Sequence, residues 1–279
     1  MFLSLDYTYF TKIPPLITKG FFTFLLVLTI ILLKYYKLVN MKQRTIQSHF
    51  IDNSLTTEKD KPTLNTNFAG IYYKALKFLV RTLTKKYDFQ VDTPTQPKIY
   101  VCRHKNTTGV ITLLKSATFD MHPLTLSVFT NFSSCFSHLL NYTFTKRYKI
   151  PKIFAVLPAF LSTLVVFPLT KSVKAVPVYR NSSKSFLTLK KATKYLLSGE
   201  SLVVFPDVDY TSIKNHVGDI YGGFLHIETL YHKACGKHVA FVPIQIDGTL
   251  NTITAKGELF LNSQEEFSAT IDKIKQRLI

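Results

Sequence analysis

The sequence predicts an α/β protein with a mostly parallel central sheet flanked by helices, preceded by an N-terminal hydrophobic membrane-anchor helix. From residue 173 onward, short apolar runs of strand length alternate with segments whose apolar residues recur at helical spacing. Near the N-terminus the apolar run 21–33 is unbroken. With 279 residues the chain is long enough for one large domain and an appendage. We therefore expect an anchor over 1–46, a polar linker over 47–67 and an α/β domain over 68–279.

Composition points to an acidic partner. The formal net charge is +18 and the isoelectric point is near 9.7, which favours anionic lipid headgroups, a phosphorylated cofactor or carrier, or nucleic acid. Positive charges are spread along the chain and no motif for reading a groove or an RNA strand is present, so we expect no nucleic acid. The 3 cysteines are isolated in the sequence and are expected to be reduced and buried, on the cytoplasmic side.

The N-terminal apolar run favours membrane attachment. A spanning helix needs about 20 apolar residues, and this run is shorter, but lysines at its edges can extend to the interface. Lysine and arginine are denser after the run than before it. We therefore expect a single-pass or monotopic protein of the cell membrane with its domain on the cytoplasmic side. A buried core helix is the alternative reading.

Two further segments are apolar. Residues 68–86 have apolar residues at helical spacing beside a basic face, which predicts a helix. Residues 153–169 form a second apolar run that is interrupted by Pro158 and Pro168. Because proline disfavours a helix interior, we expect a membrane-dipping hairpin or the wall of an apolar pocket, with a pair of core helices as the alternative.

The remaining elements follow from apolar runs, caps and breakers. Helices are expected from Thr107, from Ser182 or Ser183 to residue 197, from Gly222-Gly223 to Gly236, and after a capping box of Ser263 and Glu266. Strands are expected over 99–102, 176–179, 201–205, 238–246 and 253–261.

Polar residues follow several of these strands. His104 comes after the first strand, Arg180 after the second, and Phe205-Pro206-Asp207 ends the third. Open α/β sheets place their chemistry at the carboxyl ends of strands, and histidine is suited to accept a proton near neutral pH. His104 is therefore a candidate general base, with a solvated loop histidine as the alternative.

The order of these strand ends, together with Pro243 in the fourth strand, resembles the glycerolipid acyltransferase superfamily, typified by 1-acylglycerol-3-phosphate acyltransferases. That family has the blocks H-x-x-x-x-D, an Arg after an apolar strand, F-P-E-G-T-R-S and V-P-I-x-P-V. The resemblance covers about residues 98–246. It departs from the family at Gly109, where the family has Asp, and at Asp207-Val208-Asp209-Tyr210, where the family has E-G-T-R.

The resemblance implies an acyltransferase that moves a fatty acyl group from a thioester donor to a hydroxyl of a lysophospholipid or glycerolipid. The implied catalytic residues are His104 as general base and Asp207, with Asp209, Asn106 or a backbone carbonyl as other groups that could orient the imidazole. The implied substrate-binding residues are Arg103, Asn106, Arg180, Phe205, Pro206, Asp209, Tyr210 and Pro243. No cofactor is implied beyond acyl-CoA or acyl carrier protein as co-substrate, and the expected partners are these donors and anionic membrane lipids.

Two alternatives stay open. One is a catalytically inactive protein of the same fold that binds lipid or an acyl carrier. The other concerns His226, His232 and His238, whose steps of six do not share one helical face. We expect no metal, and these histidines are expected to be structural; a metal site that also uses Cys235 is the alternative.

Overall fold

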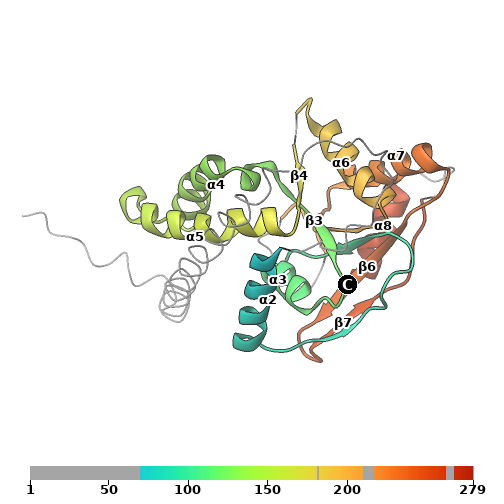
Figure 1. Cartoon of the computed structure of the whole chain (residues 1–279), viewed down its shortest axis with the longest axis horizontal. Helices are drawn as coiled ribbons and strands as arrows, with labels where there is room; N and C mark the ends of the chain where they lie inside the picture. Colours follow the sequence, from blue (N-terminus) through green and yellow to red (C-terminus); the bar gives the residue numbers. More distant parts are fainter. Residues whose placement is uncertain (1–69, 181, 210–216, 262–266, 279) are drawn as a thin grey trace, which may run out of the picture. The chain divides into compact units, whose positions relative to one another are not determined.

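A computed structural model describes residues 70–180, 182–209, 217–261 and 267–278 (Figure 1). The chain divides into two compact units, one of residues 1–61 and 135–166 and a larger one of residues 62–134 and 167–279. The expected anchor over 1–46 and the expected linker over 47–67 lie outside the described residues. Tyr210 and the expected capping box of Ser263 and Glu266 lie outside them as well.

The larger unit is built on a seven-stranded sheet with the order β1-β7-β6-β2-β5-β3-β4. Neighbouring strands pair in parallel except β6 and β7, which are antiparallel. The α/β class and the mostly parallel sheet are therefore confirmed. The strands are β1 (Asp88–Gln90), β2 (Lys98–Cys102), β3 (Met121–Leu126), β4 (Val176–Val178), β5 (Ser201–Val204), β6 (Ala240–Asp247) and β7 (Thr252–Ala255).

Helices pack on both faces of this sheet. The α-helices that lie wholly in the larger unit are α2 (Ile71–Leu83), α3 (Thr108–Ser116), α6 (Ser185–Leu197), α7 (His226–Cys235) and α8 (Phe267–Arg277), and short 3-10 turns are η2 (Ser127–Thr130) and η4 (Gly222–Leu225). Strand β2 is buried on both faces because its side chains alternate between two cores. Ile99 packs in the core that includes residues of α6, α7 and α8, whereas Tyr100 packs in the core that includes Leu113 of α3.

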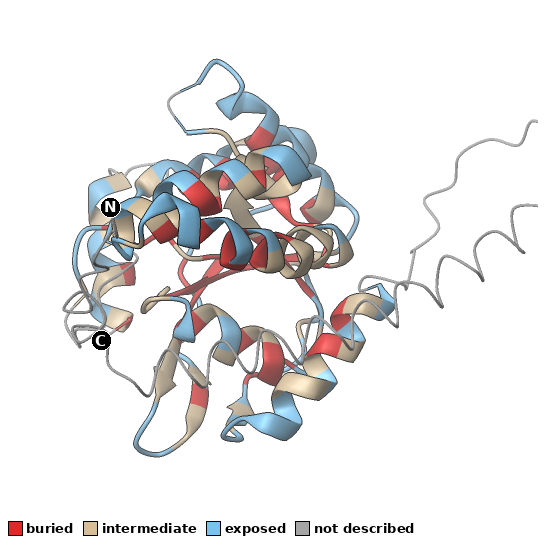
Figure 2. Cartoon of the chain, turned by 90° about the vertical axis from the view of Figure 1, so that its left-hand side faces the viewer, coloured by how far each residue is buried: buried red, intermediate tan, exposed pale blue. Residues whose placement is uncertain are grey.

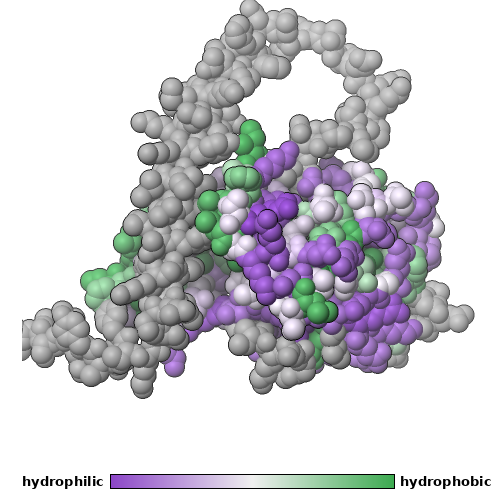
Figure 3. Space-filling model, turned by 90° about the horizontal axis from the view of Figure 1, so that it is seen from below, coloured by the Kyte–Doolittle hydropathy of each residue, from purple (hydrophilic) through white to green (hydrophobic). Residues whose placement is uncertain are grey.

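The buried residues gather in the strands and on the inward sides of the helices, as Figure 2 shows for the described residues. On the face drawn in Figure 3, hydrophilic residues cover much of the described surface and apolar residues form small separate groups. The larger unit therefore has the layered arrangement of an α/β domain, with central strands enclosed by helices.

Most expected elements of the larger unit are present, but β1 and β3 were not expected. Strand β3 begins with Met121, His122 and Pro123, and a histidine and a proline hide its strand pattern. It pairs with β5 over Met121–Pro123 and with β4 over Leu124–Leu126. The strand expected over 253–261 is shorter, since β7 ends at Ala255.

The described part of the smaller unit is helical. It contains the end of α4 (Phe132–His138), the π-helix η3 (Leu139–Arg147) and most of α5 (Lys152–Ser172), which continues into the larger unit. Small buried residues of α5, among them Ala155 and Ala159, make its packed side. The ring of Phe136 in α4 contacts that of Phe160 in α5 with centroids 6.4 Å apart, so side-chain packing joins these two helices.

Helix α5 is continuous, so the expectation of a break at Pro158 and Pro168 is wrong. Both prolines lie inside its 21 residues. Among the described residues it is the helix that is long and apolar enough to cross a membrane, by length and composition alone, with a mean hydropathy of 2.2. The two cysteines expected to be buried at positions 102 and 135 are buried, but Cys235 is exposed, contrary to expectation.

Candidate functional site

The candidate site lies where the carboxyl ends of β2 and β5 meet. These strands are parallel neighbours, with Val101 opposite Val204, so the residues that follow them converge at one edge of the sheet. His104 follows β2 and is half-buried, whereas Asp207 follows β5 and is buried. The topology therefore brings together the two residues that the sequence predicted as catalytic.

The carboxylate of Asp207 contacts the backbone N–H of His104 and the side chain of Arg103. The backbone N–H of His104 donates to Oδ2 of Asp207 at 2.7 Å. The Nε of Arg103 lies 3.7 Å from Oδ1 of the same carboxylate, and both side chains are buried. Asp207 thus fixes the turn that carries His104 and places a negative charge beside a buried guanidinium. In this geometry Asp207 bonds to the backbone of His104. A direct catalytic role for Asp207 stays a prediction.

The imidazole of His104 accepts a hydrogen bond from the turn itself. The backbone N–H of Thr107 donates to Nδ1 of His104 at 3.1 Å. Because a backbone N–H can only donate, Nδ1 carries no proton, and a neutral ring has its proton on Nε2. The ring of Phe205 meets the imidazole edge to face, with centroids 6.0 Å apart. Phe205 therefore provides an apolar neighbour for this ring.

The turn between β2 and α3 has an unusual backbone. Lys105, Asn106 and Thr107 have φ angles of 41°, 52° and 71°, which is the left-handed region that side chains with a Cβ rarely adopt. Such residues cost about 1–3 kcal/mol each and gather at functional sites, where the surrounding structure holds them. This strain marks the turn after β2 as a place where geometry has been kept at the expense of stability.

Position 109 has no room for a side chain on this backbone. This glycine is buried, and its N–H donates to the carbonyl oxygen of His104 at 3.1 Å. A Cβ at this position would lie 2.0 Å from the carbonyl oxygen of Arg103. No side chain fits there with this backbone, so an aspartate could not reach the imidazole by simple replacement.

Arg180 reaches the same edge of the sheet by way of Tyr221. Its guanidinium carbon lies 4.2 Å from the centroid of the Tyr221 ring, a cation–π contact, and Arg180 is exposed. The N–H of Tyr221 donates to the carbonyl oxygen of Pro206 at 2.8 Å. This contact links a cation that follows β4 to the Phe205-Pro206-Asp207 segment that follows β5.

The other predicted residues lie less centrally. Pro243 is buried inside β6 opposite Val101, and its carbonyl oxygen accepts from the N–H of Lys256 at 2.9 Å, so it belongs to the sheet. Asn106 lies in the strained turn and is half-buried. Asp209 is exposed, two residues after Asp207.

Cys102 lies next to this site but does not suit nucleophilic chemistry. Burial, with a smaller contribution from the nearby Asp207 carboxylate, raises the pKa of its thiol to about 12. The thiol is therefore protonated at neutral pH, and the reactive thiolate form is absent. The imidazole of His104 remains the candidate for proton transfer.

Two basic cavities of the larger unit lie away from His104. One has a volume of about 360 Å³ and is lined by Thr130, Thr170, Lys171, Lys174, Ala175, Pro177, Lys191 and Tyr195. Lys174 and Ala175 precede β4, so this cavity is at the amino edge of the parallel sheet, opposite the edge with His104. The other, of about 90 Å³, is lined by Arg81, Lys85, Lys86, Tyr87, Lys115 and Ser116. Their lysines suit anions, but neither cavity includes the candidate base.

Sequence reasoning missed two residues of the site. Thr107 contributes its backbone N–H, and a backbone donor leaves no mark in side-chain identity. Tyr221 comes from a segment between β5 and α7 for which no element was expected. A tyrosine directly before the Gly222-Gly223 turn was visible, but nothing in its neighbours indicated contact with Arg180.

Comparison with known proteins gives a similarity to a solved structure. No protein-family model matches the sequence, and no curated protein matches it. Among solved structures, the chain is similar to the 1-acyl-sn-glycerophosphate (LPA) acyltransferase PlsC from Thermotoga maritima, with a TM-score of 0.42 and 14% sequence identity over 74% of each chain.

Proposed function

We propose that this chain is an acyltransferase that moves a fatty acyl group from acyl-CoA or acyl carrier protein to a hydroxyl of a lysophospholipid or glycerolipid. The single observation that carries the proposal is the half-buried imidazole of His104 at the carboxyl edge of the sheet, in a turn fixed by Asp207. Open α/β sheets bind their ligands at this edge.

In the proposed reaction Nδ1 of His104 is the base atom, since it is the nitrogen without a proton. The acceptor hydroxyl takes the place of the Thr107 N–H at Nδ1. Its proton moves to Nδ1 while its oxygen attacks the thioester carbonyl carbon. The C–O bond forms, the C–S bond breaks, and the departing thiolate receives the proton from Nδ1. A positioned base of this kind contributes about 10²–10⁴-fold to the rate.

Arg180 is proposed to bind a phosphate of the donor or acceptor. It is exposed and rests on the ring of Tyr221, whose backbone N–H donates to the carbonyl oxygen of Pro206. Arginine binds phosphate oxygens through parallel charge-assisted hydrogen bonds. Asp209 and Asn106 are proposed to complete the acceptor site at the same edge.

Membrane lipid is the proposed partner, with the α/β unit on the cytoplasmic side of the cell membrane. Support comes from α5, where several large apolar side chains are exposed; they are Ile153, Phe154, Val156, Leu157 and Phe160. Basic residues flank this group in the sequence, at Lys146, Arg147, Lys149 and Lys152. An apolar helix face beside cations is typical of binding to an anionic bilayer surface.

The test is acyl transfer by the purified full chain in detergent, with radiolabelled acyl-CoA or acyl carrier protein and a set of lysolipids. His104→Ala is expected to lower the turnover rate by about 10²–10⁴-fold with little change in melting temperature. His226→Ala is the control for loss of an exposed histidine, since its ring packs on Phe267 of α8. Equal turnover by wild type and His104→Ala would remove the proposed base.

One observation favours a second function, the binding of lipid or acyl carrier without turnover. In the resting turn the lone pair of Nδ1 is already used by the N–H of Thr107. If this bond persists when lipid binds, His104 has no free lone pair to accept a proton. Saturable binding of acyl-CoA or lysolipid without product, unchanged by His104→Ala, would support this second function.

A further inference from the structure

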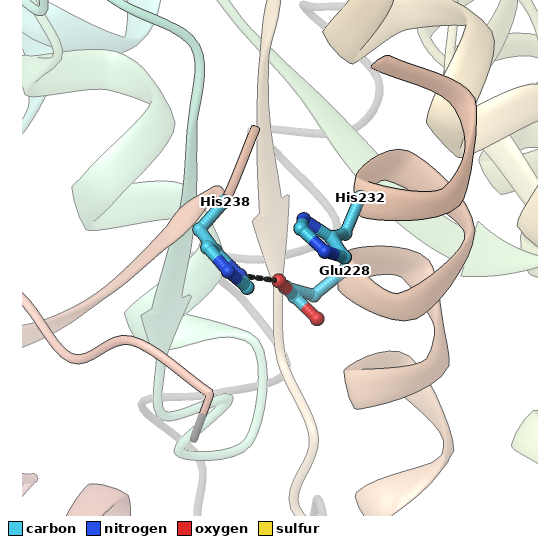
Figure 4. Close-up of side chains that lie close together, drawn as sticks. All are labelled: Glu228, His232 and His238. Atoms are coloured by element: carbon cyan, nitrogen blue, oxygen red, sulfur yellow. Dashed lines mark hydrogen bonds and ion pairs between the residues drawn. The ribbon is translucent and has the colours of Figure 1, made fainter. Parts of the chain in front are cut away.

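Three side chains with metal-binding atoms meet at the junction between α7 and β6. Figure 4 shows Glu228 and His232 on α7 and His238 on the segment that leads to β6, with the carboxylate of Glu228 beside the imidazole of His238. The Nδ1 of His238 lies 2.6 Å from Oε1 of Glu228. The rings of His232 and His238 are stacked with centroids 4.0 Å apart. One ligand atom from each residue lies within 4.8 Å of the others.

Local structure accounts for this meeting. Glu228 and His232 are four residues apart on a helix, so they share one face. Gly236 ends the helix with φ at 71°, a left-handed conformation that glycine adopts without strain, and its N–H donates to the carbonyl oxygen of His232 at 2.7 Å. The chain reverses there, and His238 returns opposite the same face.

The carboxylate of this cluster is buried, which sets it apart from a chance group of surface residues. Glu228 is 3% exposed, whereas both histidines are exposed. Burial of a carboxylate is costly unless a cation or strong donors offset it. Solvent can therefore reach the two imidazoles, whereas the carboxylate of Glu228 is buried beneath them.

We propose that Glu228, His232 and His238 bind one divalent transition metal ion of the zinc class. Two imidazoles and one carboxylate are a ligand set for Zn²⁺, Co²⁺, Ni²⁺ and Fe²⁺, whereas Ca²⁺ and Mg²⁺ prefer oxygen ligands alone. Bonds of about 2.0–2.2 Å to the ion require the ligand atoms to be farther apart than a hydrogen bond allows. Binding therefore replaces the Glu228–His238 hydrogen bond, and any proton between them leaves to solvent.

The position of this site indicates that the ion has a structural role and not a catalytic one. His238 precedes β6, and Lys98 at the start of β2 pairs with Ala240 at the start of β6. The cluster is thus at the amino edge of the sheet, while His104 follows the carboxyl end of β2. The ion would connect α7 to β6, the strand that pairs with β2. This structural role is separate from the proposed acyl transfer.

The experiment is calorimetric titration of the full chain in detergent with Zn²⁺, and with Co²⁺ as a spectroscopic probe. We expect one ion per chain, visible d–d absorption bands for Co²⁺, and a rise in melting temperature on metal addition. His232→Ala and Glu228→Gln are expected to weaken binding by at least about tenfold, which is a loss of about 1.4 kcal/mol.

His226→Ala is the matched control, since this histidine lies on the same helix outside the cluster. His232 is exposed, so His232→Ala folds even if a change at buried Glu228 does not. The proposal is overturned if His232→Ala and the control bind Zn²⁺ as tightly as wild type, or if only Ca²⁺ and Mg²⁺ bind.

Discussion

At the scale of single residues, the path of the turn after β2 depends on the absence of a side chain at Gly109. Its missing Cβ allows the carbonyl oxygen of Arg103 to approach closely, and its N–H holds the carbonyl of His104. The same turn includes consecutive left-handed residues, so its path is held by packing against Gly109 and by the carboxylate of Asp207. The position of the imidazole depends on these backbone contacts.

Gly109→Ala is therefore expected to lower the free energy of unfolding by about 1–3 kcal/mol, because the added carbon forces the turn away from Arg103. Gly109→Asp is expected to do the same and not to raise acyl transfer. Thermal and urea unfolding measure the stability change. Gly218→Ala is the control, since a Cβ there meets nothing within 4 Å. Higher turnover by Gly109→Asp would contradict the steric account.

The sequence was sufficient to predict that His104, Phe205 and Asp207 lie near one another. Parallel strands put their carboxyl ends at one edge, and residue types at strand ends are readable from the chain. The atoms in contact could not be predicted, because backbone donors such as the N–H of Thr107 carry no signature in side-chain type. The meeting of Glu228, His232 and His238 was missed for another reason. The histidines were compared with each other, while the informative spacing was the four residues from Glu228 to His232.

At the scale of elements, α5 shows that the rule against proline inside a helix does not hold for this strongly apolar helix. Pro158 and Pro168 predicted a break, because proline removes a donor and crowds the preceding turn. The helix nevertheless continues through both, and Pro158 lies on its buried side. Prolines are tolerated inside strongly apolar helices, where neighbouring groups satisfy the freed carbonyls. Strand β3 was missed on the same rule, since Pro123 hides it.

We predict that the exposed apolar face of α5 inserts into an anionic bilayer. In a Cys235→Ser background, Leu157→Cys is labelled with an environment-sensitive fluorophore. Its emission is expected to shift to shorter wavelength with anionic vesicles and to be quenched by spin-labelled lipids. This readout does not depend on whether the N-terminal segment also attaches the chain.

Leu250→Cys in the same background is the matched control. Leu157 is 62% exposed and Leu250 is 71% exposed, and Leu250 lies in the turn between β6 and β7. Its fluorophore is expected to stay in water. Equal quenching at both positions, or at neither, would speak against insertion of this face of α5.

At the scale of the whole molecule, His122 joins several elements of the larger unit. Its Nε2 lies 2.6 Å from a carboxylate oxygen of Glu200 after α6, and its Nδ1 lies 3.2 Å from the carbonyl oxygen of Lys174 before β4. The ring stacks on Tyr195 with centroids 3.8 Å apart. Burial lowers the pKa of His122, although the Glu200 contact opposes this. The folded state therefore binds this proton less readily than the unfolded chain.

The sign of the pH dependence follows from that shift. A lowered histidine pKa stabilises the fold above the ordinary value of 6.5, and this contribution is lost as the pH falls below it. The melting temperature is expected to fall between about pH 8 and about pH 5, and to fall less in His122→Gln, which keeps a donor for Glu200. Burial also lowers the pKa of His138, but that histidine is present in both proteins. Identical pH profiles would exclude His122 as a source.

The division of the chain has a consequence for how its length can vary. Residues 135–166 leave the larger unit after β3 and return before β4, and these two strands are adjacent, with Leu124 opposite Val176. The excursion therefore begins and ends on neighbouring strands whose register is set by their own backbone pairing. Deletions or additions inside it would leave that pairing in place, so this stretch is where the architecture can gain or shed material without redesign of the sheet.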